Sequence, residues 1–237
     1  MNVNDVPEFT YPKSCWMEGI FARQLELRGK YHHIEEANGF RQPSSIPVNL
    51  HDRFDQAVIK DLAWRFTEEL AEAHECLLPY YADGAMWYDK PEVHHYREEL
   101  MDGLHFLTEL TLLAGAGAQD LYPTADADFR PSVRMNRWLR LDEELKRETS
   151  CPSGVDWLQE CAFRVIIPLG VMCNTLKNKP WKNTHQLTDV AAFQSNLRKV
   201  WAEFGFLLRE SGFTAEGVYD LYIRKNEVNK FRQRSNY

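Results

Sequence analysis

Two segments of the chain combine a helical apolar stripe with a pair of carboxylates at the edge of that stripe. Apolar residues recur every three or four positions in residues 52–78 and in residues 92–113, a spacing that predicts two long amphipathic helices. Each helix must bury its stripe against another element, so the segments require a helical core that covers both. The stripes consist of Leu62, Phe66, Leu70, Ala73 and Leu77 in the first segment, and of Leu100, Leu104, Leu107 and Thr111 in the second.

Four acidic residues lie beside these stripes. At about 100° per residue, Glu69 and Glu72 flank the first stripe, and Glu99 and Asp102 flank the second. Residues at i and i+3 on a helix lie about 5–6 Å apart at Cβ, so each pair can act on one ligand. Carboxylates at the border of a core are unfavourable unless a positive charge lies among them. Hard cations such as Mg²⁺ prefer oxygen ligands, so the pattern predicts a divalent metal site between facing helices.

The alternative is that these acids belong to solvated helix faces, where most charged residues are found. The matched phase of the two pairs favours the metal site. The same helical phase turns other glutamates outward, and these are expected to face solvent: Glu68, Glu75, Glu98 and Glu109.

The rest of the sequence predicts an all-α protein. No stretch alternates with period two over the length of a strand. Hydrophobic residues make up 44% of the chain, which is sufficient for one domain over residues 1–237. Both halves contain a long helix, a Trp-containing connection and a second amphipathic helix, a plan that allows an internal pseudo-repeat.

Charge and cysteine usage argue against several classes of protein. The net charge of -7 disfavours a general nucleic-acid-binding surface. Five cysteines without a Cys-x-x-Cys pair fit a reducing cytoplasm better than a disulfide framework. The N-terminus has no apolar signal-peptide core, and the longest apolar runs are too short to cross a bilayer. We therefore expect a cytoplasmic protein with no nucleic-acid or membrane partner.

The C-terminal residues form a basic segment, with five Arg/Lys against one Glu from Ile223 onward. Tyr222, Lys225, Asn229 and Arg232 follow one another at steps of three, four and three, so a helix would present them on one face. That face offers two cations and two hydrogen-bonding groups to an anion. The alternative is a frayed basic tail, since chain termini are ordered only when something ties them down.

These motifs resemble a known superfamily. Glu69-x-x-Glu72, then 26 residues, then Glu99-x-x-Asp102-Gly-Leu-His-Phe is similar to the metal-binding signature of the all-α NTP pyrophosphohydrolases. That superfamily includes the MazG proteins, the dimeric dUTPases and the T-even phage dCTPase–dUTPases. The ending LYIRKNEVNKFRQRSNY looks like the C-terminal signature of the last two groups, and LKNKPWK at residues 176–182 resembles a loop of some dimeric dUTPases. Two features depart from the pattern: Asn236 replaces a frequent Gly, and LKNKPWK follows the second acidic motif rather than preceding it.

The resemblance implies a MazG- or dimeric-dUTPase-like helical bundle that acts as a homodimer. Its activity would be the hydrolysis of a dNTP, with dUTP or dCTP favoured, to dNMP and pyrophosphate. The metal-binding and catalytic residues would be Glu69, Glu72, Glu99 and Asp102, holding Mg²⁺ or, as a substitute, Mn²⁺. The substrate-binding residues would be Lys225, Asn229 and Arg232 on the phosphates, Tyr222 on the same face, and Gln24, on a helix predicted over residues 20–36, at the base.

Several alternatives stay open at this point. A purine dNTP is the alternative substrate, and a non-catalytic helical binding protein is the alternative function. The water molecule that attacks the phosphate could be aligned by any of the four carboxylates or by a neighbour such as Glu75. Gln24 could be an ordinary surface glutamine. A carboxylate di-iron bundle requires Glu-x-x-His motifs, and only Asp102-x-x-His105 comes close.

Overall fold

The computed structural model describes residues 2–6, 16–81, 90–121, 138–139, 154–179 and 181–234. All regular elements in these ranges are helices, which confirms the predicted all-α class. None of these helices combines the length and apolarity that a membrane span requires. In chain order the elements are the 3₁₀ helix η1 (Val3–Asp5), α1 (Trp16–Ala37), α2 (Arg53–Glu75), η3 (Leu78–Tyr80), α3 (Glu92–Leu113), η4 (Ala118–Leu121), α5 (Val155–Thr175), α6 (Val190–Glu210) and α7 (Ala215–Arg234).

The two acid-bearing segments form α2 and α3 close to their predicted bounds. Helix α2 begins after Asp52, whose carboxylate accepts hydrogen bonds from the backbone N–H groups of Phe54 and Asp55 at 2.8 and 3.0 Å. Such an N-cap satisfies donors that the start of a helix leaves free, and it explains why the helix begins here. Helix α3 occupies the whole range predicted from its apolar period.

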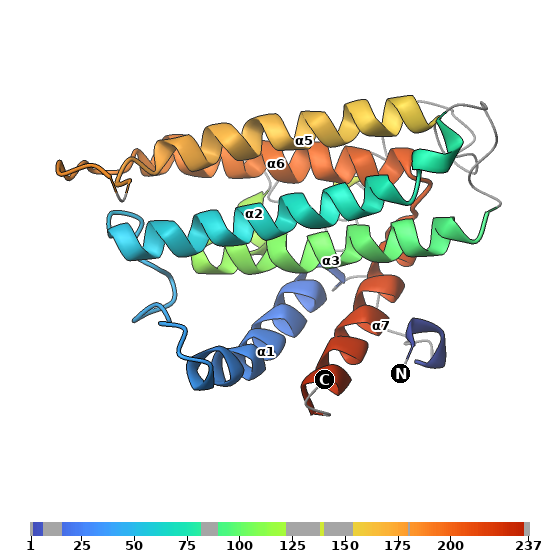
Figure 1. The fold of residues 1–237 in the computed structure, drawn as a ribbon, viewed down its shortest axis with the longest axis horizontal. Coiled ribbons are helices and arrows are strands. Elements are labelled where there is room, and N and C mark those ends of the chain that lie inside the picture. Colours follow the sequence, from blue (N-terminus) through green and yellow to red (C-terminus); the bar gives the residue numbers. More distant parts are fainter. Residues whose placement is uncertain are drawn as a thin grey trace.

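Four helices form a bundle of two antiparallel pairs, α2 with α3 and α5 with α6 (Figure 1). Side chains at the centre join the two pairs. The Phe66 and Phe204 rings meet edge to face with centroids 5.2 Å apart, and the Trp201 indole N–H donates to Thr111 Oγ1 at 2.8 Å. The plan of a long helical pair thus occurs twice, in agreement with the similarity predicted between the two halves.

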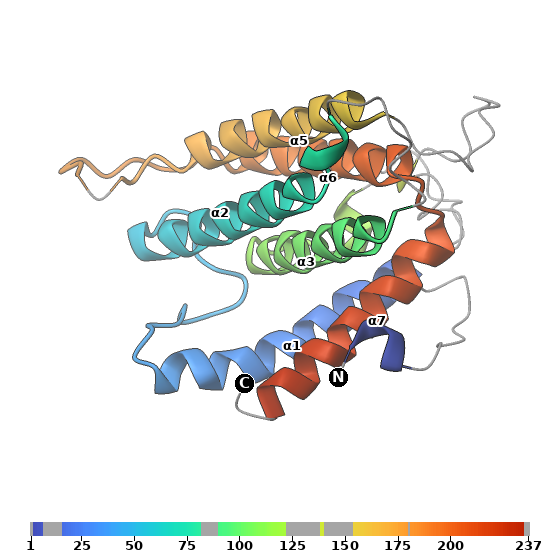
Figure 2. The ribbon, with the colours of Figure 1, turned by 45° about the vertical axis from the view of Figure 1, so that its right-hand side comes forward.

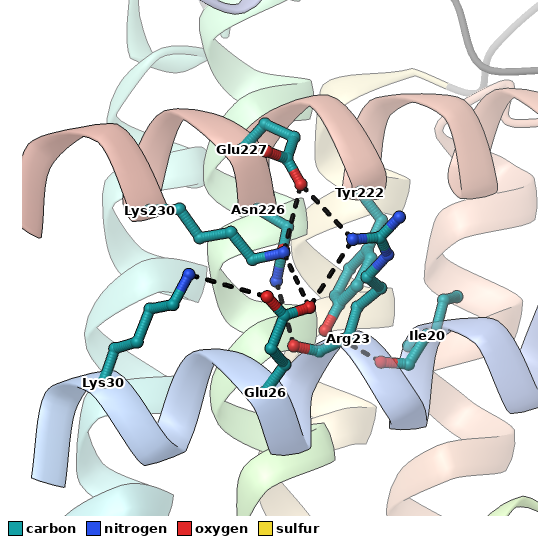
Figure 3. Close-up of polar contacts among 8 residues, drawn as sticks. All are labelled: Ile20, Arg23, Glu26, Lys30, Tyr222, Asn226, Glu227 and Lys230. Carbon is teal, nitrogen blue, oxygen red and sulfur yellow. Dashed lines mark hydrogen bonds and ion pairs between the residues drawn. The ribbon is translucent and has the colours of Figure 1, made fainter. Parts of the chain in front are cut away.

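Helices α1 and α7 form a second layer next to α3 (Figure 2). They run parallel, because their contacts advance along both helices in the same order. These contacts are drawn in Figure 3: Tyr222 Oη donates to the Ile20 carbonyl at 3.3 Å, Asn226 Nδ2 to the Arg23 carbonyl at 3.4 Å, and Lys230 Nζ to Glu26 at 2.9 Å.

An ion-pair network at the end of this contact holds the C-terminal helix in place (Figure 3). The Lys230 side chain is only 3% exposed, and its ammonium reaches both Glu26 at 2.9 Å and Glu227 at 3.1 Å. Arg23 adds a pair with Glu227 at 3.5 Å. The alternative of a frayed basic tail is therefore wrong as far as Arg234, because α1 supplies the acidic and carbonyl partners that tie the segment down.

Replacing Lys230 with Ala is expected to lower the free energy of unfolding by about 1–3 kcal/mol, because two carboxylates lose a buried partner. Urea unfolding followed by circular dichroism measures the change. Lys30→Ala is the matched control: Lys30 also pairs with Glu26, at 3.5 Å, but its side chain is 39% exposed. The control should change the free energy by less than about 0.5 kcal/mol. Equal effects of the two substitutions would show that the α1–α7 network adds nothing to stability.

Candidate active site

Three of the four predicted acidic residues converge between α2 and α3. One carboxylate oxygen from each of Glu69, Glu99 and Asp102 lies within 4.8 Å of the others. Glu69 comes from α2, and the other two come from successive turns of α3. The helical phase predicted from the apolar stripes therefore brings these side chains together at the edge of the core.

A glycine allows the two helices to approach each other at this point. Gly103 follows Asp102 on α3, and a Cβ placed on it would lie 3.3 Å from the Phe66 ring and 3.6 Å from Glu69 Cβ. The first of these distances is tighter than an ordinary van der Waals contact, so a larger residue would push α2 away. The absence of a side chain at Gly103 thus brings Glu69 next to the carboxylates of α3.

The acidic cluster contains more negative charge than its protein surroundings neutralise. Burial raises the pKa of Glu69 to about 8, and the charges of Asp102, Glu99 and Glu72 add to the increase. Burial also raises the pKa of Glu99, against the opposing effect of Lys225. Lys225 and His95 oppose the increase at Glu99, whereas the neighbouring charges around Glu69 all act in the same direction as burial. A close group of oxygen ligands whose negative charge is only partly neutralised fits a hard divalent cation.

Glu72, the fourth acidic residue of the predicted metal site, lies outside this cluster. Its side chain is exposed on α2, one turn after Glu69. It is still close enough for its charge to raise the pKa of Glu69. The structure therefore places Glu72 beside the cluster rather than within it.

Lys225 lies against the cluster and is almost fully buried. Its ammonium is 2.9 Å from Asp102 and 3.3 Å from Glu98, and its side chain is 5% exposed. Burial alone would lower the pKa of Lys225, but the carboxylates of Asp102 and Glu98 raise it above its usual value. The prediction that Glu98 faces solvent is thus wrong, because α7 covers that side of α3 and provides a cation for it.

The cluster opens into a cavity of about 330 Å³ between α1, α2, α3 and α7. Glu69 and Asp102 belong both to the cluster and to the cavity wall. Asn229 from α7 also lines the cavity, whereas Arg232 lies exposed one turn further along α7. The remaining wall residues are Gln24, Leu27, Tyr31, Glu35, Leu62, Arg65, His105, Phe106 and Glu109.

Gln24 and Glu109 form a buried polar group at the cavity wall. Gln24 is 2% exposed, which excludes an ordinary surface glutamine, and its Nε2 donates to Glu109 Oε2 at 3.1 Å. Arg28, one turn further along α1, forms an ion pair with Glu109. Burial raises the pKa of Glu109, while the charge of Arg28 opposes the change. The prediction that Glu109 faces solvent is therefore wrong, because α1 covers this side of α3 and supplies a guanidinium.

Tyr222 positions two of the residues that line the cavity. Its hydroxyl donates to Gln24 Oε1 at 2.9 Å, and its ring stacks on His105 with centroids 4.1 Å apart. Tyr222 itself is completely buried, so it holds these neighbours rather than forming the exposed part of a binding face. In the sequence, His105 stands out only through the incomplete iron motif Asp102-x-x-His105, although its position three residues after Asp102 indicates the same helical face.

The LKNKPWK loop lies at the other end of the bundle. The backbone N–H of Asn178 donates to Gln56 Oε1 at 2.9 Å, and its side-chain amide donates to the His51 carbonyl at 2.8 Å. These contacts anchor the loop at the first turn of α2. Glu69 lies 16 residues after the start of that helix, roughly 24 Å away at the rise of an α-helix. The described part of the loop is therefore remote from the acidic cluster of its own chain.

A family model described as dUTPase matches residues 66–237. The match covers most of the chain and includes the three clustered acids and all of α7. The chain belongs to the dUTPase family. No curated protein and no solved structure gave a significant match.

Family membership confirms the resemblance inferred from the acidic and C-terminal motifs. dUTPase-family proteins are hydrolases that act on nucleoside triphosphates, generally with a divalent metal ion. The match begins in α2, so α1, which contributes Gln24 and Arg28, lies outside the matched residues. The acids and α7 therefore belong to the family-defining part of this chain, and part of the cavity wall does not.

Glu69 should make the metal-free protein less stable as the pH rises. Its pKa is about 8 in the folded chain against an ordinary value of 4.5. Between these pH values the unfolded chain loses a proton that the folded chain keeps, so the free energy of unfolding falls as the pH rises. The contribution of protonated Glu69 to stability is therefore complete below pH 4.5 and is lost toward pH 8. Glu69→Gln cannot titrate, and its free energy of unfolding should therefore exceed that of the wild type increasingly between pH 5 and pH 8.

Urea unfolding with a chelator at several pH values tests this prediction. Glu68→Gln is the control, because Glu68 is exposed on the outer face of the same helix. The difference in the free energy of unfolding between Glu68→Gln and the wild type should not change with pH. A constant difference for Glu69→Gln as well would mean that Glu69 ionises normally.

Proposed function

We propose that this protein hydrolyses a pyrimidine deoxynucleoside triphosphate, dUTP and/or dCTP, to the monophosphate and pyrophosphate with Mg²⁺. The observation that supports this most directly is the sharing of Glu69 and Asp102 between the acidic cluster and a cavity lined by polar and apolar groups. A cavity of about 330 Å³ suits a small-molecule ligand. Purine dNTPs are the alternative substrates.

The metal ligands in this proposal are Glu69, Glu99 and Asp102, with Glu72 as the fourth. A bound divalent ion would polarise phosphoryl oxygens and stabilise the attacking and leaving oxygens of the displacement; Mn²⁺ would serve as a substitute. The chain contributes a cluster in which Glu69 would release its proton when a cation binds, because the positive charge offsets the burial and the carboxylate repulsion that raise its pKa. Cation binding and proton release are thus coupled at one carboxyl.

In this proposal the phosphates of the substrate are bound by Lys225, Asn229 and Arg232 of α7. Lys225 places an ammonium beside Asp102, Asn229 places an amide at the cavity wall, and Arg232 extends the same face toward solvent. A triphosphate carries charge along its length, and cations spaced along one helix suit it. Tyr222 supports this face from within the core, through its contacts with Gln24 and His105.

In this proposal the base of the nucleotide occupies the part of the cavity that α1 lines. Leu27, Leu62 and Phe106 offer apolar surface for a base, and Gln24 with Glu109 offers polar atoms at its edge. The Gln24 amide is held at both ends, by Tyr222 and by Glu109, so its orientation is fixed before a ligand binds. Such preorganisation favours selection among bases over adaptation to several.

The homodimer implied by the resemblance is also part of the proposal. Helix α5 exposes Phe163, Ile167 and Val171 by 57%, 51% and 49% at helical spacing. Apolar stripes of this kind are commonly covered by another protein surface.

Incubation with dUTP or dCTP and Mg²⁺ is expected to yield the nucleoside monophosphate and pyrophosphate, with the pyrimidine substrates preferred over dATP and dGTP. Chromatography that separates the mono- and diphosphates, combined with separate assays of pyrophosphate and orthophosphate, measures this. Orthophosphate with dNDP would contradict the proposed reaction. A clear preference for a purine would change only the assignment of the base.

Glu99→Gln and Asp102→Asn should each reduce kcat/KM at least about a hundredfold, because a ligand of the metal loses its charge. Glu72→Gln should also reduce it if this exposed residue completes the ligand set. The control is Glu68→Gln, since Glu68 is exposed on the outer face of α2, where it accepts a hydrogen bond from the Trp64 indole at 2.7 Å. This variant should stay within about twofold of the wild type. Circular dichroism verifies the helix content of each variant, and full activity of both Glu99→Gln and Asp102→Asn would remove the cluster from the active site.

A further inference from the structure

We propose that Arg65 is a further phosphate-binding residue, whose guanidinium contacts the phosphates of the nucleotide from the α2 side of the cavity. The inference rests on the proposed function. It adds a cation on α2 to the phosphate-binding residues assigned to α7, so the triphosphate would be bound from two sides.

The wall of the cavity carries more acidic than basic side chains. Its acidic members are Glu35, Glu69, Asp102 and Glu109. Among the described residues that form this wall, Arg65 is the only arginine or lysine, since neither Lys225 nor Arg232 belongs to it. A triphosphate that enters an acidic cavity requires positive charge besides the metal ion, and Arg65 supplies it at the wall itself.

The guanidinium of Arg65 keeps hydrogen-bond donors available for a ligand. Nε donates to Asp61 Oδ2 at 2.9 Å, whereas neither Nη group has a hydrogen-bond partner among the described residues or is sealed from solvent. The Arg65 side chain is 42% exposed and that of Asp61 58%. Exposed pairs of this kind contribute little to stability, so Asp61 competes only weakly with a phosphate.

Helix α2 places Arg65 next to the acidic cluster. Leu62, Arg65 and Glu69 all line the cavity and follow one another at steps of three and four, so one face of α2 presents them. Arg65 lies about 6 Å along the helix from Glu69, on the side of Leu62. Its guanidinium carbon is 6.0 Å from the centre of the Phe106 ring, which belongs to the cavity wall on α3.

The charge of Arg65 selects the phosphates as the part of the nucleotide that it contacts. The base and the sugar of a pyrimidine deoxynucleotide are uncharged at neutral pH, and the phosphates lie next to the metal ion. The planar guanidinium can donate to two phosphate oxygens at once, which an ammonium cannot do in the same geometry. The position of Arg65, between the acidic cluster and the apolar part of the cavity, fits the phosphate end of the substrate.

The alternative is that Arg65 and Asp61 form a surface ion pair that only stabilises α2. The two side chains would then act as a unit, and removing either would change the protein in the same way. If Arg65 binds phosphate, Asp61→Asn instead frees the guanidinium, and it should leave activity unchanged or higher.

The test measures inhibition of turnover by two ligands in the wild type and in Arg65→Gln. One ligand is the α,β-imido analogue of the substrate with Mg²⁺, and the other is the uncharged deoxynucleoside of the same base. Arg65→Gln should weaken binding of the analogue roughly ten- to a hundredfold, because hydrogen bonds to a charged group are lost, and should leave binding of the nucleoside within about twofold. Arg65→Lys keeps the charge without the planar fork and should fall between.

Arg198→Gln is the matched control, because Arg198 is exposed on α6 and lies outside the cavity wall. It should leave both inhibition constants within about twofold of the wild type. The inference is overturned if Arg65→Gln binds the analogue as the wild type does, if it weakens the nucleoside equally, or if Asp61→Asn weakens the analogue as much. Each outcome requires a wild type that hydrolyses the dNTP; one that hydrolyses none would refute the proposed function, and the inference with it.

Discussion

The close approach of α2 and α3 beside mutually repelling carboxylates is the constraint on which the site depends. Gly103 permits the approach, and burial of the Phe66 ring against α3 and α6 maintains it. The same packing holds Glu69, Glu99 and Asp102 within reach of one another, although separation would relieve their repulsion. The raised pKa of Glu69 has this origin: burial and the neighbouring carboxylates disfavour its ionised form unless a cation lies beside it.

Acidic residues elsewhere near the cavity have protein partners. Glu109 pairs with Arg28, and Glu26 and Glu227 share Lys230. Those pairs join α1 to α3 and to α7, so they assemble the second layer of helices against the first. The contrast separates two uses of buried charge. Compensated charges position the helices, whereas the partly uncompensated cluster leaves electrostatic attraction available for a ligand.

The helical period predicted much of this arrangement. It placed α2 and α3 close to their observed bounds and put Glu69, Glu99 and Asp102 on facing edges, because each position depends only on phase relative to an apolar stripe. The same reasoning failed for Glu98 and Glu109. Helix α3 is covered on more than one side, by α2, α1 and α7, and phase relative to one stripe says nothing of a second or third neighbour. His105 was missed as a cavity residue for the same reason.

The sequence by itself determined the all-α class, the two acid-bearing helices, the single face of α7 and, through its motifs, the family. These are local properties, since helical periodicity and motif spacing do not depend on distant residues. The tertiary structure decided which charges are neutralised. Lys225 forms ion pairs with Asp102 and Glu98. Arg28 pairs with Glu109, whereas Glu72 remains exposed. The state of a buried charge is set by partners that come from other helices, and helix packing, rather than helical phase, brings those partners together.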